Sequence, residues 1–442
     1  MNSNSPKRVL FISYPFPPVG GAGVQRTTKF VKYLSEFGWL SSVLTVANPS
    51  VPALDHSLVK DVPAHTLVRR ARTWEPSYSA KSALAGAGNG EARRTGNLKG
   101  MLKSAVHWAA RLALQPDPQI LWMPGAIGEG RKLLAEAPHS AIVASGPPFS
   151  TFLIGASLSR HSGLPLVLDY RDEWDISNAY LENKRLDRFS LSLQSRMQRS
   201  VVRTARVLMA TTRCSANALN IVRERARSKA EVTWIYNGYD PEDFQGAQAE
   251  PASAKQTYQL AYVGTLWNLT SAEPLVAAVE RLSERNPQQA SRLELIFAGR
   301  RTPQQSEILA RLKRLPAKLV EIPYVDHHGA VNLVRSADGL CVLLSDVRAA
   351  ERVVPAKIFE YMAAGRAIIG IGPKGEMWEL LRECPAARLN EPKDVDGIAD
   401  TLSREIQRVS AGRALELNGW NPSAYDRRSE AGQLAGILNS IC

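Results

Sequence analysis

Residues 8–26 read RVLFISYPFPPVGGAGVQR, and this stretch decides the fold that the rest of the sequence continues. It begins with an apolar run typical of a buried strand, passes through a loop that contains Gly20, Gly21 and Gly23, and enters an amphipathic helical pattern. Strand, loop and helix in this order open the βαβ unit of a parallel sheet. Glycines let the backbone approach a ligand closely, and the free N–H groups of a helix start attract phosphates. The loop is therefore a candidate ligand site, with a plain turn as the alternative, because it is longer than a dinucleotide-binding turn.

The alternation of apolar runs and helical patterns continues along the chain and predicts two α/β domains. In the first half, apolar runs predict buried parallel strands at 8–14, 42–47, 141–145, 166–170, 207–211 and 232–236, with helical patterns at 24–37, 150–160, 185–203 and 215–227. In the second half, strands are predicted at 259–264, 293–298, 319–325, 339–344 and 367–371. The aperiodic stretch 241–255 has the composition of a linker. We therefore expect an α/β protein of two Rossmann-like, doubly wound domains, at 1–245 and 255–415, and a C-terminal helix within 416–442 that packs back on the first domain.

Length and composition exclude several classes of protein. The chain has 442 residues, of which 44% are hydrophobic and 22% charged, as in soluble proteins with more than one hydrophobic core. No apolar run reaches the length of a membrane-spanning helix, and the N-terminus leads straight into a strand, so we expect a cytoplasmic protein. The four cysteines have no paired spacing, which favours reduced thiols over disulfides or a metal site.

The chain is basic, with 55 lysines and arginines against 42 aspartates and glutamates and a net charge of +13. Such an excess favours anionic partners, namely nucleic acid, an acidic membrane surface or phosphorylated substrates. Nucleic acid is the least favoured of these, because the basic residues are dispersed and lack interleaved aromatic side chains.

Residues 73–120 lack strand signals and interrupt the first domain. They contain an amphipathic helical pattern at 97–114, in which Lys99, Lys103 and Arg111 form a basic row beside an apolar stripe with a tryptophan. Such a helix can lie on an anionic membrane, which would place the protein on the inner face of the cell membrane as a peripheral protein. The alternative is a helix that covers an edge of its own domain with a solvated basic row.

A cluster of charged residues follows the fourth predicted strand, where residues 169–175 read DYRDEWD. Open α/β sheets bind their ligands at the carboxyl ends of the strands, and this cluster lies at such an end. Asp172 and Arg171 are the favoured functional residues, since a carboxylate there can accept a proton or a hydrogen bond from a substrate hydroxyl. An ion-pair network that closes the sheet is the alternative.

The densest group of candidate residues lies between two predicted strands of the second half. Arg348 and Arg352 occupy a loop, and Lys357 and Glu360 follow at i, i+3 spacing on a short helix that ends at Gly365. A cation near a helix start suits a diphosphate, and a glutamate one turn along can accept both hydroxyls of a ribose. The alternative is an intrahelical pair of Lys357 and Glu360, which contributes only a few tenths of a kcal/mol.

Together these motifs resemble glycosyltransferase family 4, whose members are retaining enzymes of the GT-B fold, over almost the whole chain. The N-terminal pattern is similar to a bacterial branch that acts in surface polysaccharide assembly. Further matching motifs are SGPPFS at 145–150, DYRDEW at 169–174, NGYD at 237–240, YVGT at 262–265 and PAKIFEYMAAG at 355–365.

The resemblance implies roles for individual residues of a cleft between the two domains. The residues that we expect to bind the donor are Gly20, Gly21, Gly264, Thr265, Arg348, Arg352, Lys357 and Glu360; of these, Glu360 matches the second glutamate of the family's E-x7-E motif, which binds the ribose. Arg171 and Asp172 would be catalytic at the acceptor side, where the histidine common in the family is missing. Gly23, Arg26 and Trp174 would contact the acceptor.

Three positions depart from the family pattern. The first glutamate of the motif is replaced by Arg352, and the usual phosphate-binding arginine and lysine are replaced by Thr265 and Thr270. We therefore expect Lys357, assisted by Arg348 or Arg352, to supply the cations for the donor diphosphate.

The resemblance implies hexosyl transfer with retention from a nucleotide sugar to a lipid-linked or growing bacterial surface glycan. The leaving diphosphate itself would help to deprotonate the acceptor, and the protein would need no cofactor and no metal. Two alternatives stay open: a nucleotide-sugar epimerase of the same twin-domain fold, and a non-catalytic binder of sugar nucleotides.

Overall fold

The computed structural model describes residues 6–51, 54–76, 114–176, 187–245 and 254–442. The chain divides into two compact units, the first of residues 1–211, 215–235 and 431–442 and the second of residues 212–214 and 236–430. The boundary at 235 lies before the predicted one at 245 because the residues after it pack within the second unit. For example, the ring of Tyr236 lies 6.3 Å from that of Phe359, and the backbone N–H of Tyr239 donates to the carbonyl of Tyr425.

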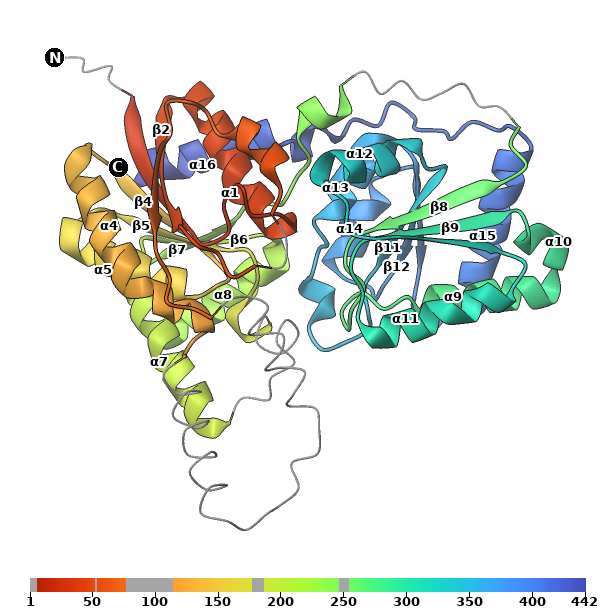
Figure 1. The fold of residues 1–442 in the computed structure, drawn as a ribbon, viewed down its shortest axis with the longest axis horizontal. Helices are drawn as coiled ribbons and strands as arrows, with labels where there is room; N and C mark the ends of the chain where they lie inside the picture. The colour runs from red at the N-terminus through yellow and green to blue at the C-terminus, as the bar shows by residue number, and fades with distance from the viewer. Residues whose placement is uncertain (1–5, 52–53, 77–113, 177–186, 246–253) are drawn as a thin grey trace, which may run out of the picture. The chain divides into compact units, whose positions relative to one another are not determined.

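The first unit is built on a parallel sheet with the strand order β3-β2-β1-β4-β5-β6-β7 (Figure 1). Its strands are β1 (Lys7–Ser13), β2 (Trp39–Val46), β3 (Leu67–Ala71), β4 (Ala141–Gly146), β5 (Leu166–Tyr170), β6 (Val207–Ala210) and β7 (Glu231–Trp234). The helices that carry its residues are α1 (Ala22–Tyr33), α4 (Met123–Glu136), α5 (Ser150–Ser162), α7 (Arg188–Thr204), α8 (Arg213–Ala226) and α16 (Arg427–Ile441). Short 3-10 helices lie at Leu34–Phe37, His56–Asp61 and Pro118–Trp122.

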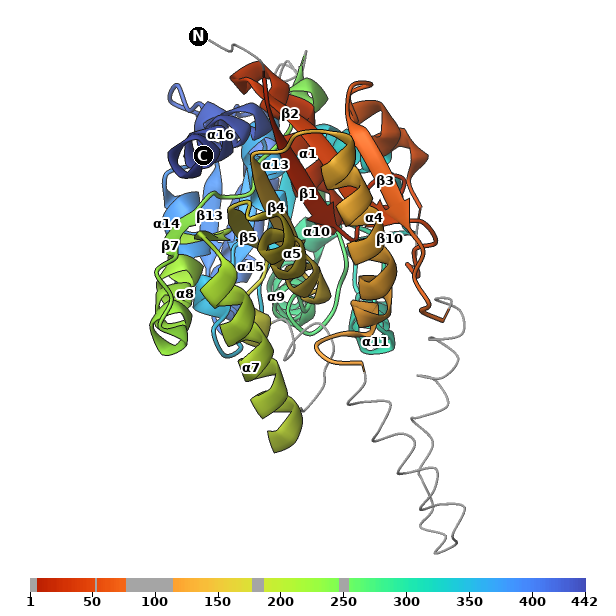
Figure 2. The ribbon, with the colours of Figure 1, turned by 90° about the vertical axis from the view of Figure 1, so that its left-hand side faces the viewer.

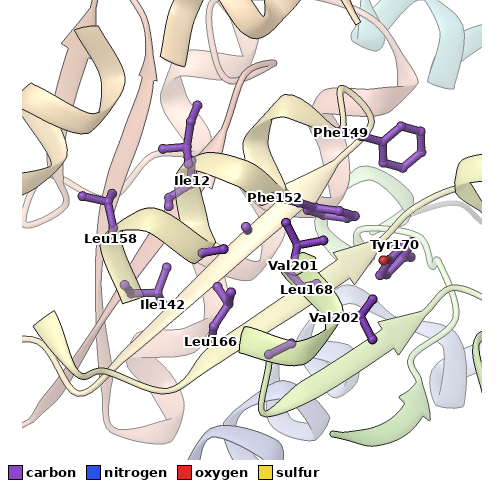
Figure 3. Packing of buried hydrophobic residues seen from close by; sticks show 14 of the residues in the cluster. Ile12, Ile142, Phe149, Phe152, Leu158, Leu166, Leu168, Tyr170, Val201 and Val202 are labelled. Atoms are coloured by element: carbon purple, nitrogen blue, oxygen red, sulfur yellow. The ribbon is translucent and has the colours of Figure 1, made fainter. Parts of the chain in front are cut away.

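Both faces of this sheet are buried, which explains the continuous apolar runs in its strands. In β1, Leu10 and Ile12 belong to a core with residues of α4, α5 and α7. Figure 3 shows part of this core, where Ile12 lies with residues of β4, β5, α5 and α7. The alternate residues Val9 and Phe11 pack in a second core with α1 and α16. The helix α16 supplies Ala431, Leu434, Ala435 and Leu438 to that core. The C-terminal helix therefore completes the first unit.

The second unit has a parallel sheet of six strands in the order β10-β9-β8-β11-β12-β13. Its strands are β8 (Tyr258–Val263), β9 (Leu293–Ala298), β10 (Lys318–Ile322), β11 (Gly339–Leu343), β12 (Ala367–Ile371) and β13 (Ala387–Asn390). Its helices are α9 (Glu273–Arg285), α10 (Pro287–Ala290), α11 (Pro303–Ala310), α12 (His327–Ser336), α13 (Lys357–Ala364), α14 (Glu376–Arg382) and α15 (Val395–Ser410). Short 3-10 helices lie at Pro241–Phe244, Arg311–Arg314, Ala350–Arg352 and Pro422–Tyr425.

Successive side chains of a strand point to opposite faces of the sheet, so the second unit also has two cores. Leu260 and Tyr262 of β8 pack with α9, α11 and α15, whereas Ala261 between them packs with α12, α13 and α14. Loops and helix starts therefore collect at the carboxyl ends of these strands, where β8 leads into Gly264 and the connection after β11 leads into α13.

The predicted fold class, two Rossmann-like doubly wound domains, is confirmed by these two parallel sheets. The edge strands β3 and β13 were not predicted, because their sequences LVRRA and ARLN mix charged with apolar residues and leave most positions partly exposed. The predicted helix at 97–114 lies outside the described residues except for Leu114. Within the described ranges, no helix combines the length and the apolar character required to cross a bilayer.

Candidate functional site

The strand β8 of the second unit ends in a backbone geometry that only glycine adopts easily. Gly264 has a φ of 140°, and a Cβ atom there would lie 2.6 Å from Nζ of Lys357. Gly299, at the end of β9, has a φ of 129°, and its Cβ would lie 2.3 Å from the carbonyl oxygen of Gly264. Two glycines therefore let two loops and a lysine side chain meet at the carboxyl end of the sheet.

Lys357 is the first residue of α13, and its ammonium group lies over the ring of Tyr262, with Nζ 3.7 Å from the ring centroid. A cation over an aromatic face is held by the ring quadrupole. Within the described ranges, this ammonium donates no hydrogen bond and forms no ion pair. Burial lowers the pKa of Lys357 to about 7, although the neighbouring Cys341 and Glu360 oppose that shift.

Tyr262 is itself fixed by the loop that follows β8. Its hydroxyl donates to the carbonyl of Thr265 at 2.9 Å, and the Thr270 hydroxyl donates to the same carbonyl at 2.8 Å. Thr265 and Thr270 thus take part in the hydrogen bonds that shape this loop, and the Lys357 ammonium lies beside it over the Tyr262 ring.

Glu360 lies one turn after Lys357 on α13 and is half-buried. The two residues form no ion pair with each other, so the alternative of an intrahelical pair is not what this structure shows. Burial raises the pKa of the Glu360 carboxyl, which His327 and Arg427 oppose. His327 in turn lies 2.7 Å from the Asp243 carboxylate through Nε2. A half-buried carboxylate without a hydrogen bond within the described part of the chain is suited to accept one from a ligand.

The two predicted arginines precede α13 on the connection from β11. The side chain of Arg348 is exposed and that of Arg352 is half-buried. The carbonyl of Arg352 accepts a hydrogen bond from the Thr212 hydroxyl at 3.1 Å, which anchors this part of the connection. The structure therefore gathers Gly264, Lys357 and the arginine-bearing connection at one end of one sheet.

In the first unit, the glycine-rich loop leads from β1 into α1. Gly21 has a φ of 100° and precedes the first turn of α1, and a Cβ atom there would meet open space. At Gly23, by contrast, a Cβ would lie 2.8 Å from Nη1 of Arg171. The Arg171 guanidinium donates to the carbonyls of Gly23 and Pro147 and so ties the glycine-rich loop to the loop after β4.

The neighbouring Asp172 is the member of the predicted catalytic pair whose side chain is exposed. The hydrogen bonds of the Arg171 guanidinium go to backbone carbonyls of two loops. Its position is therefore suited to hold both loops in place. The exposed Asp172 carboxylate fits contact with a substrate.

Two residues predicted to contact the acceptor lie in the interior. Arg26 is 2% exposed, and its Nε lies 3.0 Å from Oδ1 of Asp169, whose Oδ2 accepts from the Ser145 hydroxyl. Trp174 is equally buried, stacks on Phe149 at 4.5 Å, and donates through Nε1 to a glutamine. In this structure both side chains pack inside the first unit, next to the loops that follow its strands.

The sequence analysis also missed a buried carboxylate in the second unit. Glu376 begins α14, is 1% exposed, and accepts hydrogen bonds from the backbone N–H groups of Arg213 and Cys214 at 2.6 and 2.7 Å. The Tyr236 hydroxyl donates to it at 2.6 Å. Its signal in the sequence is the run GPKGE after an apolar strand, which marks a strand end and a helix start.

Comparisons with known proteins give a family for each half of the chain. Residues 21–238 match the glycosyl transferase 4-like domain, and residues 257–408 match the glycosyl transferases group 1 family. The chain is a group 1 glycosyltransferase. No curated protein matches it by sequence.

Solved structures that resemble this glycosyltransferase share the GT-B fold. Sucrose-phosphate synthase from Thermosynechococcus elongatus has a TM-score of 0.64 at 15% identity and covers 98% of each chain. HepE from Anabaena, in complex with UDP and glucose, has a TM-score of 0.58 at 16% identity over 98% of this chain and 100% of its own. WaaG, a glycosyltransferase involved in lipopolysaccharide biosynthesis, has a TM-score of 0.55 at 12% identity over 98% and 97%.

Gly264→Ala should destabilise the glycosyltransferase, because the new Cβ would meet the Lys357 ammonium at a φ that L-residues rarely adopt. Strained backbone of this kind costs roughly 1–3 kcal/mol. Gly436→Ala on α16 is the control, since its Cβ meets nothing within 4 Å, and it should stabilise the protein by roughly 0.5–1 kcal/mol. Differential scanning calorimetry measures both changes. Equal stability of Gly264→Ala and the wild type would contradict the geometry described at β8.

Proposed function

We propose that the protein is a retaining glycosyltransferase that moves a hexosyl group from a nucleotide sugar to a lipid-linked or growing bacterial surface glycan. The observation that carries this proposal is the Lys357 ammonium over Tyr262, beside Gly264 and without an anionic partner among the described residues. The likeness to HepE, solved with UDP and glucose, and to WaaG, involved in lipopolysaccharide biosynthesis, supports the substrate classes.

The diphosphate of the donor is the ligand that this end of the second sheet suits best. Lys357 offers a positive charge and the start of α13 adds its dipole, while Gly264 leaves space for close backbone contact. Arg348 and Arg352 on the same connection supply further donors. Half-burial of Lys357 makes its contact with the diphosphate stronger than it would be in water.

The ribose of the donor is assigned to Glu360. Its carboxylate has two oxygens, which can accept hydrogen bonds from two adjacent hydroxyls. Glu360 lies on the same short helix as Lys357, one turn further from the helix start. This order matches the nucleotide, in which the ribose follows the diphosphate. Two pairs of charged side chains lie near the Glu360 carboxyl: His327 with Asp243, and Arg427 with Glu430.

In the transfer that the family resemblance implies, the bond from the anomeric carbon to the diphosphate breaks and a bond to the acceptor oxygen forms on the same face. The acceptor proton passes to an oxygen of the leaving diphosphate. The residues of this chain then stabilise the charge of the leaving group, through Lys357, and hold the acceptor hydroxyl, through Asp172.

We propose that no metal is required, because the lysine and the helix start supply positive charge. A cytoplasmic enzyme on the inner membrane face fits a lipid-linked acceptor.

The experiment that tests the proposed function is a transfer assay with a panel of nucleotide sugars, preselected by thermal shift, in the presence and absence of a bacterial glycolipid extract. We expect acceptor-dependent release of the nucleoside diphosphate, a product with the anomeric configuration of the donor, and activity that persists with a chelator. Epimerisation of a donor without any acceptor would instead establish the epimerase alternative. Loss of activity with the chelator and its return with a divalent ion would overturn metal independence.

Glu360→Ala should weaken the binding of the selected nucleotide sugar roughly tenfold or more, because hydrogen bonds to a charged group contribute about 1.5–3 kcal/mol. Isothermal titration calorimetry measures the dissociation constant. Glu307→Ala is the matched control, since this exposed glutamate lies on α11 of the same unit. Equal affinity of Glu360→Ala and the wild type would remove the ribose assignment.

The pKa of Lys357, lowered by burial to about 7, predicts a pH-dependent affinity for the donor. Below that pH the free protein carries the charged ammonium, and above it the ammonium loses its proton before binding. Affinity for the nucleotide sugar should therefore fall as pH rises above 7, by up to about tenfold per pH unit. A nucleotide sugar is the suitable probe because its diphosphate diester keeps a constant charge in this range.

Lys357→Met should bind the donor weakly at every pH and lose this dependence, whereas Lys313→Met, at an exposed position of the same unit, should keep the wild-type profile. Calorimetric titrations at several pH values give both curves. A wild-type pH profile in Lys357→Met would assign the titration to another group.

A further inference from the structure

Trp74 carries the most exposed large apolar side chain in the described part of the chain. It is 85% exposed, whereas the other exposed side chains of this kind are at most 57% exposed. Trp74 follows β3, a strand at the edge of the first sheet that Figure 2 shows beside α4. Single exposed apolar side chains are common on protein surfaces. A site at Trp74 therefore needs support from its backbone, its neighbours and its place in the sheet.

The backbone on both sides of Trp74 is fixed. The Asn48 amide donates through Nδ2 to the carbonyl of Thr73 at 3.1 Å and accepts from the Thr73 N–H at 2.9 Å. On the other side, Glu75 is 8% exposed and accepts from the Tyr14 hydroxyl at 2.7 Å. The indole of Trp74 is thus exposed although the chain that carries it is held in place.

Arg72 lies on the same exposed face as Trp74. Residues 71–76 alternate along the chain: the buried ones are Ala71, Thr73 and Glu75, and the exposed ones are Arg72, Trp74 and Pro76. This period of two is that of an extended segment, in which positions two apart lie about 6.6–6.8 Å from each other. Within the described part of the chain, the Arg72 guanidinium donates no hydrogen bond and forms no ion pair. The face therefore offers a cation and an aromatic ring side by side.

This pair lies at the edge of the sheet where ligands of α/β proteins bind. Trp74 comes just after the carboxyl end of β3, as Asp172 comes just after that of β5. Three strands, β2, β1 and β4, separate β3 from β5, so four spacings put the two residues roughly 19 Å apart. A ligand that reaches both must be a chain of several sugars and cannot be a single one.

The groups around Trp74 match a sugar that carries a carboxylate. The C–H groups of a sugar ring pack on the electron-rich face of an indole, and a guanidinium binds a carboxylate with two parallel hydrogen bonds. The Asn48 side chain is exposed, and beside its two bonds to Thr73 it keeps one N–H and one lone pair for a hydroxyl. Single-stranded nucleic acid fits less well, because it stacks on successive aromatic rings and the exposed positions between 68 and 76 offer one.

We propose that Arg72 and Trp74 form a distal acceptor subsite for an acidic sugar, with the sugar ring on the indole and its carboxylate on the guanidinium. The inference rests on the proposed function, whose acceptor it narrows to an acidic glycan of several residues. The subsite holds a part of the glycan away from the hydroxyl that reacts. It therefore sets acceptor affinity and does not take part in bond breaking.

The first test is calorimetric titration of the full-length protein with tetrasaccharides of galacturonate, mannuronate and guluronate, and with their methyl esters as uncharged controls. We expect at least one acid to bind roughly tenfold or more tightly than its ester, as for hydrogen bonds to a charged group. Arg72→Gln should bind acid and ester equally. Arg131→Gln, at an exposed position of α4 in the same unit, should keep the wild-type preference. No binding of any acid, or an unchanged preference in Arg72→Gln, would overturn the inference.

Tryptophan fluorescence gives a second readout, which a merely structural role of Trp74 would not change. The bound acid should alter the emission of the wild type, and Trp74→Phe should bind with similar affinity but lose that change. Trp74→Ala should bind acid and ester about fivefold more weakly, because the ring contact is lost. Trp234→Ala, on β7 at the opposite edge of the sheet, should keep both affinity and signal. Persistence of the signal in Trp74→Phe, full affinity in Trp74→Ala, or tighter binding of oligouridylate than of any acid would contradict the subsite.

The transfer assay separates this inference from the proposed function. With an acidic acceptor, Trp74→Ala should raise KM for the acceptor much more than it lowers kcat. If nucleoside diphosphate is released but no acidic glycan binds, the subsite alone is wrong. If acids bind through Arg72 and Trp74 but no donor is consumed with any acceptor, the transferase proposal is wrong and the glycan site remains.

Discussion

The burial of both faces of each parallel sheet is the constraint on which the rest of this structure depends. In β1 and in β8, successive side chains enter opposite cores, so the strands have no surface left for chemistry. Polar groups that contact a substrate must therefore lie at the carboxyl ends of the strands. Asp172 follows β5, and Gly264 follows β8, for this reason.

Within that constraint, the two half-sites are held by different means. In the first unit, buried charges do the positioning: Arg26 pairs with Asp169, and Arg171 holds two loops through their carbonyls. In the second unit, glycines with positive φ bring the backbone close to a lysine whose ammonium lies over an aromatic ring and, among the described residues, forms no ion pair with a carboxylate. In the first arrangement Arg26 faces a carboxylate and Arg171 faces two carbonyls, whereas the Lys357 ammonium of the second forms no ion pair within the described residues. This difference is the reason for assigning the donor diphosphate to the second unit.

Most of the architecture could be predicted from the sequence because doubly buried strands produce continuous apolar runs. The edge strands β3 and β13 were not predicted, since half-exposed strands need not be apolar. The contact between Arg26 and Asp169 was not predicted for another reason: the two residues are 143 positions apart, and only the fold brings them together. The spacing of Lys357 and Glu360 allowed either a pair or two separate ligand contacts, and only the side-chain positions in the structure distinguish them.

The central claim is that the lysine at the start of α13 and the glycine after β8 hold the donor diphosphate. A crystal structure of the protein with a bound nucleotide sugar tests this claim most directly. The account predicts the diphosphate within hydrogen-bond distance of Nζ of Lys357 and in contact with the backbone at Gly264, with the ribose hydroxyls on Glu360. A diphosphate bound instead at Gly20 and Gly21, with Lys357 still free of any anion, would contradict it.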